Sequence, residues 1–241
     1  MGLFSTVMHI YKRDQANIVA ELSNELTRQY NLQKISRLNI DNSNYERVLE
    51  KDVASQNGIF YLITQPHGSW TTIIELNVSI EPSFYLYELA NSLSKRLNTY
   101  VLSFHLHDGD VLLYNLEKKG ESLDGYNSDY QYFLTEVADR NEILSQRHTP
   151  NYFLNILPIE KNISTLNSIL NEGYWNAFDN CDLNEDGVPN DDKYFVDEQD
   201  RLERIGKYLG IFSANEYPFA DWRDHLQKLD LNNCYLLKAM R

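Results

Sequence analysis

Residues 99–116 read TYVLSFHLHDGDVLLYNL, which is two apolar runs on either side of an Asp108-Gly109 pair. Asp-Gly between alternating apolar residues is the strongest short signal for a β-hairpin. With a two-residue turn, His107 would lie opposite Asp110, and His105 opposite Leu112. The core face would then carry Leu102, Phe104, Leu106, Val111 and Leu113, and the opposite face Ser103, His105, His107, Asp110 and Tyr114.

Strand and helix patterns alternate on the N-terminal side of this hairpin. Apolar residues four apart, such as Ile18, Leu22 and Leu26, predict an amphipathic helix. The segment QPHGS between two apolar runs predicts a turn and therefore a second hairpin. The expected elements are strands at 4–11, 35–40, 58–64 and 70–76, a short helix near 45–53, and helices at 14–30 and 86–97.

A weak internal repeat suggests how these elements combine. Residues 21–31 (ELSNELTRQYN) resemble residues 88–98 (ELANSLSKRLN), and the same offset places strand over strand on both sides. Two β-α-β-β units would share one antiparallel sheet of about six strands with both helices on one face, an α+β fold. Chance similarity between two amphipathic helices remains the alternative, and it leaves the fold class unchanged.

The pattern changes after residue 130, where helical periodicity dominates. The expected helices are 132–146, 159–170, 196–209 and 218–229, and Pro150 and Pro158 interrupt the chain between them. We therefore expect residues 1–135 to form the sheet core. Residues 136–241 would form a mainly helical layer packed on it within one globular unit.

The charge of the chain is strongly acidic and unevenly placed. Of the net charge of −13, residues 172–203 contribute −9, from eleven acids against Lys193 and Arg201. A chain this acidic and without a basic stripe is a poor candidate for binding nucleic acid or an anionic membrane. A basic partner, a metal ion or simple solubility would each account for the charge.

The sequence also predicts a compartment. We identify neither an apolar run of membrane-spanning length nor a secretory signal. Cys181 and Cys234 lie far apart and outside any metal-ligand spacing, so they are expected to be free thiols in a reducing environment. The expected location is the cytoplasm.

Two segments offer candidate ligands for metal ions. His105, His107 and Asp110 would converge on one face of the hairpin, as zinc or iron sites require, or they form an ordinary polar surface. The segment DLNEDGVPNDD, beginning at Asp182, resembles a calcium-binding loop with a glycine at its sixth position. Lys193 stands where an EF-hand has its bidentate glutamate, and an acidic solvated loop is the alternative. The calcium ligands would be Asp182, Asn184, Asp186, Val188 and Asn190.

A set of short motifs over residues 58–135 resembles a group of uncharacterised bacterial proteins. The shared pattern is W-T-T from Trp70, H-x-H-D-x-D-V-L-x-Y from His105, and D-x-Y-N-S-x-x-x-Y-F from Asp124. The resemblance implies no activity and no catalytic residue.

No standard phosphate-loop, nucleophile-elbow, zinc-helix or dinucleotide motif is present in the sequence. The sequence therefore favours a cytoplasmic partner-binding protein with an acidic surface, of the immunity or antitoxin kind. The tyrosine-rich residues 125–133 would supply contact area, or fold back and bury their rings. The alternative function is a metal-dependent hydrolase that uses His105, His107 and Asp110, and the sequence does not decide whether the protein is an enzyme.

Overall fold

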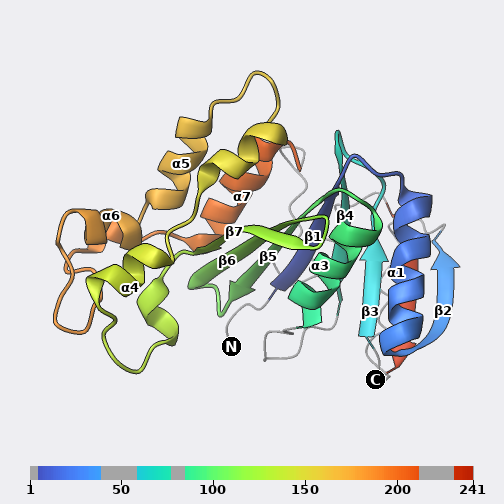
Figure 1. Ribbon diagram of the computed structural model, residues 1–241, viewed down its shortest axis with the longest axis horizontal. Coiled ribbons are helices and arrows are strands. Elements are labelled where there is room, and N and C mark those ends of the chain that lie inside the picture. Colours follow the sequence, from blue (N-terminus) through green and yellow to red (C-terminus); the bar gives the residue numbers. More distant parts are fainter. Residues whose placement is uncertain (1–4, 39–58, 77–84, 212–230, 241) are drawn as a thin grey trace.

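The computed structural model describes residues 5–38, 59–76, 85–211 and 231–240, and these ranges form one antiparallel sheet covered by helices (Figure 1). The eight strands lie in the order β2-β8-β3-β4-β1-β5-β6-β7. Their bounds are β1 (Ser5–Tyr11), β2 (Asn31–Arg37), β3 (Ile59–Ile63), β4 (Trp70–Glu75), β5 (Tyr100–His107), β6 (Val111–Lys118), β7 (Glu121–Asn127) and β8 (Tyr235–Met240). Each neighbouring pair is antiparallel.

Helices lie on both faces of the sheet. The α-helices are α1 (Gln15–Gln29), α3 (Tyr85–Arg96), α4 (Arg140–Ser145), α5 (Ile163–Asn171), α6 (Tyr174–Asp179) and α7 (Glu198–Leu209), and the 3-10 turns are η2 (Tyr130–Phe133), η3 (Pro150–Asn155) and η4 (Asp192–Tyr194). One core packs α1 and α3 against Met8, Ile73 and Val101. The other packs α5, α6 and α7 against Val7 and Phe104 on the opposite face.

The predicted amphipathic helices are confirmed where the apolar stripe is clear. In α1 the stripe residues Ile18, Leu22 and Leu26 are completely buried. The carboxylate of Asp14 accepts a hydrogen bond from the backbone N–H of Asn17 and so caps the first turn. Helix α7 likewise follows the expected stripe at residues 196–209, and the predicted hairpin at 58–64 and 70–76 forms as β3 and β4.

The expected sheet of about six strands from two β-α-β-β units is wrong, although the α+β class holds. The structure has eight strands, and β2 does not pair with β3, because the C-terminal strand β8 lies between them. Strand β8 carries Leu236 and Leu237 side by side, and both are buried, one in each core. A strand buried on both faces lacks the polar alternation that marks a strand in sequence.

The expectation of a mainly helical C-terminal half is also wrong, whereas the two helices expected on one face, α1 and α3, do pack into the same core. Residues 132–146 form η2, a loop and the six-residue α4 instead of one helix. Asp129 and Asp139 each cap a separate short element by accepting hydrogen bonds from backbone N–H groups, which divides the segment. The helices expected near 45–53 and at 218–229 lie outside the described residues.

The two chain regions separated at residue 135 share one sheet. Strand β8 comes from the second region and pairs with β2 and β3 of the first. Both cysteines are free, as expected, with Cys181 exposed and Cys234 buried.

The position of β8 makes a stability prediction. Leu237 is fully buried and lies directly opposite Ile35 of β2, which is 46% exposed. Leu237→Ala should lower the free energy of unfolding by about 2–5 kcal/mol through the lost burial and the cavity left behind. The matched change Ile35→Ala should cost less than about 1 kcal/mol. Urea unfolding measures the free energy of unfolding of both variants. Equal losses would contradict the prediction that β8 is buried within the sheet while β2 lies at its edge.

Candidate functional site

The β5–β6 hairpin forms, but its register differs from the expected one. His107 pairs with Val111 and His105 with Leu113, so residues 108–110 make a three-residue turn. Asp108 and Gly109 both adopt positive φ, and the N–H of Asp110 donates to the carbonyl of His107. The extra turn residue moves every β6 side chain to the opposite face, because side chains alternate along a strand. Tyr114 is therefore in the core beside Phe104.

This register separates Asp110 from His105 and His107, the other two predicted metal ligands. His105 is only 4% exposed, and its Nδ1 lies 2.9 Å from Oγ1 of Thr6. Burial, with a smaller effect from His107, lowers the pKa of His105 to about 4, so the ring is neutral at pH 7. Asp110 lies in the exposed turn and not on the strand face. In the described ranges, no group of three His, Cys, Asp or Glu side chains is placed to hold a metal ion.

His107 has aromatic neighbours on its side of the hairpin. Its ring makes edge contacts with Phe133, at a centroid distance of 5.1 Å, and with Tyr132 at 5.8 Å. His105 and His107 thus lie on one face, as expected, but Asp110 does not complete a ligand set with them. The geometry gives the metal-dependent hydrolase no support.

The predicted calcium loop is a compact turn held by its own side chains. Oδ1 of Asn184 accepts hydrogen bonds from the N–H groups of Asp186 and Val188. The Val188 carbonyl accepts from the N–H of Asn184, and the Nδ2 of Asn190 donates to Asp182. The side-chain oxygen of Asn184 is thus occupied by bonds within the loop, and calcium binding stays a prediction.

Lys193 supplies a cation beside this loop. Its Nζ lies 3.1 Å from Oδ2 of Asp182 and 3.3 Å from Oδ2 of Asp191. Hydrogen bonds from Lys193 lower the pKa of both carboxyl groups. An added calcium ion would therefore compete with the Lys193 ammonium for the same oxygens.

A pocket of about 450 Å³ lies between the acidic segment and the histidine hairpin. We call it the acidic pocket. Six carboxyl groups line it, from Asp110, Asp129, Asp191, Asp192, Asp197 and Glu198. Its aromatic walls are Tyr132, Tyr174, Tyr194 and Phe195. Among the described residues, no lysine or arginine lines it. The pocket thus concentrates negative charge beside aromatic rings.

Two polar atoms are buried at the wall of this pocket, and a hydrogen bond from Ser128 acts on the carboxyl group that carries one of them. They are Oε2 of Glu198 and the hydroxyl of Tyr174, whose residues are 5% and 4% exposed. Burial raises the pKa of Glu198 to about 7, against the opposing charge of Arg201, and raises that of Tyr174 to about 12. The charge of Asp129 acts in the same direction on both groups, so Asp129 lies near each of them.

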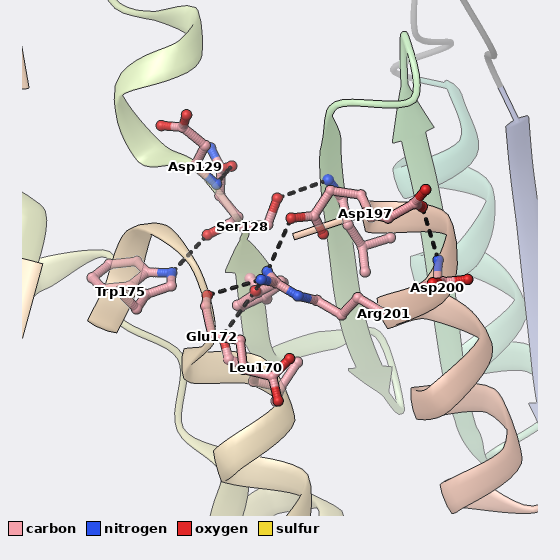
Figure 2. A network of polar contacts seen from close by, with 12 residues as sticks. Ser128, Asp129, Leu170, Glu172, Trp175, Asp197, Asp200 and Arg201 are labelled. Atoms are coloured by element: carbon pink, nitrogen blue, oxygen red, sulfur yellow. Dashed lines mark hydrogen bonds and ion pairs between the residues drawn. The ribbon is translucent and has the colours of Figure 1, made fainter. Parts of the chain in front are cut away.

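Arg201, whose neighbour in the network Glu198 lines the pocket, is the centre of a network of polar contacts (Figure 2). Arg201 is completely buried, and its guanidinium lies 3.2 Å from Oε1 of Glu198. It also donates to the Tyr126 hydroxyl and, at 2.8 Å, to the backbone carbonyl of Glu172. The Tyr126 hydroxyl in turn donates to the Leu170 carbonyl. This network joins α7, β7 and the end of α5.

Gly173 fits between this network and the pocket. Its φ is +71°, and a Cβ there would lie 3.1 Å from Nη2 of Arg201 and 3.2 Å from the carbonyl oxygen of Tyr194. A larger residue would be strained by its backbone and crowded by the arginine. The pocket wall therefore depends on a glycine at this point.

The tyrosine-rich residues 125–133 were expected either to be exposed as contact area or to bury their rings, and the structure shows some of each. Tyr126 is 4% exposed and part of the core, whereas Tyr132 is 42% exposed. Phe133 and Phe195 are exposed by 46% and 80%. Aromatic side chains that are exposed beside a pocket are typical of interaction surfaces.

The sequence indicated part of this site. The dense acids of residues 172–203 pointed to Asp191, Asp192, Asp197 and Glu198, but Asp129 was not singled out and Asp110 was assigned to a different site. The helix expected at 196–209 includes Asp197 and Glu198, yet no sequence signal places Glu198 and the buried Tyr174 at the same pocket. That juxtaposition comes from the packing of α6 and α7 on the sheet.

Comparisons with protein family models, curated proteins and solved structures gave no match for this chain. The resemblance to a group of bacterial proteins therefore stays a prediction. Within the described ranges, the helices are too short or too polar to cross a membrane.

The Arg201 network makes a stability prediction with a built-in control. Arg201→Met should lower the free energy of unfolding by about 3–5 kcal/mol, because it leaves the Glu198 carboxyl group buried without its ion pair. Arg204 pairs with Glu172 through two contacts of 2.6 Å but is 46% exposed. Arg204→Met should cost less than about 1 kcal/mol. Similar losses of the free energy of unfolding, measured in urea, would contradict the prediction that the buried Arg201 ion pair stabilises the fold more than the exposed Arg204 pair.

A second prediction concerns the loop from Asp182. Lys193→Gln removes the competing ammonium, so we expect calcium to bind this variant at least severalfold more tightly than the natural chain. Titration calorimetry measures the two affinities, and Lys193→Gln combined with Asp186→Ala serves as the control that should lose binding. Absence of heat at millimolar calcium in every variant would identify the loop as an acidic turn.

Proposed function

We propose that this chain is a cytoplasmic partner-binding protein, of the immunity or antitoxin kind, that docks a basic protein on its acidic pocket. The observation that carries the proposal is the gathering of six carboxyl groups and four aromatic residues around one pocket. Carboxylates concentrated at a concave site attract and orient a positively charged surface. Aromatic rings then supply contact area at low cost in conformational entropy.

The distribution of charge supports a localised docking site. Asp110 and Asp129 come from the sheet region, and the other four acids come from the segment around α7. The two regions thus add their charges at one place on the molecule. Exposed Phe195 and Tyr132 at the same place can be covered by a partner.

Capture of the partner from the native host at low and high salt tests the proposal. The immobilised chain should retain a basic protein at low ionic strength and lose most of it at high ionic strength, where charge attraction is screened. The variant with Asp110→Asn and Asp192→Asn should capture several times less of the same protein. Both acids are exposed, so their loss should leave the fold intact.

A matched variant controls for total charge. Glu121→Gln with Glu160→Gln removes two exposed acids that do not line the pocket, and it should capture as much as the natural chain. Equal capture by the two double variants, or no specific basic protein at low salt, would overturn the proposal.

A further inference from the structure

We infer that the outer edge of β7 binds an extended, uncharged segment of a partner protein, which pairs through its main chain and runs in the same direction as β7. Strand β7 is the last strand of the sheet. A groove of about 470 Å³ at this edge is lined by β7 residues and by Ser145, Gln146 and Arg147 at the end of α4. We call it the edge groove, and no described residue lines both it and the acidic pocket.

The hydrogen bonds between β6 and β7 show which main-chain groups of β7 point outward. The Ser128 N–H donates to the Leu112 carbonyl, and hydrogen-bonded pairs alternate with non-hydrogen-bonded pairs along an antiparallel ladder. Gly125 and Asn127 therefore belong to non-hydrogen-bonded pairs, and their N–H and C=O groups point away from β6. The Asn127 carbonyl confirms this direction, because it accepts a hydrogen bond of 2.8 Å from the Trp175 indole.

Two of these four outward groups are already used by the chain. The Asn127 carbonyl is bonded to Trp175, and a backbone hydrogen bond from Gly125 acts on the Asp124 carboxyl group. The Gly125 carbonyl and the Asn127 N–H have no partner within the described ranges. Both residues line the edge groove, and Gly125 is exposed.

The spacing of the two remaining groups selects the direction of an incoming strand. An antiparallel strand exchanges two hydrogen bonds with one residue, and neither Gly125 nor Asn127 has both of its groups available. In a parallel pair, one residue donates to a carbonyl of the neighbouring strand and accepts from the N–H two residues further on. An incoming residue opposite Tyr126 would therefore bond to the Gly125 carbonyl and to the Asn127 N–H.

The geometry of the chain itself does not require a glycine at residue 125. Gly125 is not among the residues with positive φ, and a Cβ there would lie 3.8 Å from Oδ1 of Asn115, its nearest neighbour. The register shift of β7 lies before Asp124. A glycine inside a strand weakens it and can mark a place where another backbone approaches closely. The missing side chain thus leaves the edge open to a second main chain.

The charged groups of the edge groove favour an uncharged segment. Asp124 accepts hydrogen bonds from the Tyr114 hydroxyl and from the Thr149 N–H. Arg147 donates to both carboxylate oxygens of Asp179. The groove is thus lined by one acid and one base that already have partners, so it offers no excess charge to a charged ligand.

NMR titration of the isotope-labelled chain with acetyl-Thr-Val-Thr-Val-Thr-amide tests the inference. The peptide should slow the hydrogen exchange of the Asn127 amide. It should bind at least about fivefold more tightly than the same peptide N-methylated at its three central residues, which has lost the donors for pairing. A nitroxide on the peptide N-terminus should broaden the Ser122 amide more than the Asp129 amide, because a parallel segment begins beside the start of β7.

Two variants of the edge should each weaken the peptide by about fivefold or more. Asn127→Pro removes the outward N–H, and Gly125→Val places a branched side chain beside the Gly125 carbonyl. Proline is tolerated in an edge strand whose N–H faces outward, and valine favours strands, so urea unfolding should show both variants folded. The matched control Gln33→Val changes an exposed residue of β2, the opposite edge strand, and should leave the affinity unchanged.

Several results would overturn the edge site. They are equal binding of the N-methylated peptide, no binding of the unmodified peptide at millimolar concentration, and full binding by both edge variants. Stronger broadening at Asp129 would contradict the parallel direction, and tighter binding of maltose would assign the groove to a neutral sugar. A dimer in sedimentation that Gly125→Val abolishes would assign the edge to a second copy of this chain.

Discussion

The ion pair between Arg201 and Glu198 is the constraint on which the C-terminal part of the structure depends. A completely buried guanidinium must have its hydrogen bonds satisfied, because burying an unpaired charge is very costly. The Nη groups of Arg201 meet this demand through Tyr126 of β7 and through the Glu172 carbonyl after α5, whereas its Nε has no hydrogen-bond partner among the described residues. Helix α7 is thereby fixed on the sheet, and its first turn becomes one wall of the acidic pocket (Figure 2).

The same interaction explains why so acidic a segment can fold compactly. Residues 172–203 carry eleven acids, and their mutual repulsion favours an extended chain. Arg201 inside the fold and Lys193 at its surface each bring acids together, the first through Glu198 and the second through Asp182 and Asp191. Glu198 and Asp191 also line the acidic pocket, so these two cations offset part of its negative charge.

The sheet likewise depends on a pairing between strands that are far apart in the sequence. Strand β8 lies between β2 and β3 and pairs with both, so a C-terminal segment connects N-terminal strands within the sheet. The helices on the two faces are then held by one continuous layer with two cores. The acidic pocket lies where the β5–β6 turn, which carries Asp110, and the chain after β7, which carries Asp129, meet the first turn of α7 with Glu198.

The sequence alone determined the elements whose signals are local. The stripes of α1, α3 and α7, the β3–β4 hairpin and the concentration of acid all follow from periodicity, turn residues and charge. Tertiary structure decided the β5–β6 register, because the local Asp-Gly signal admits turns of two or three residues and core packing of Tyr114 selects between them. It also decided the place of β8 and the gathering of Glu198, Tyr174 and Asp129 at one pocket. These depend on contacts between residues far apart in the chain, which no local pattern encodes.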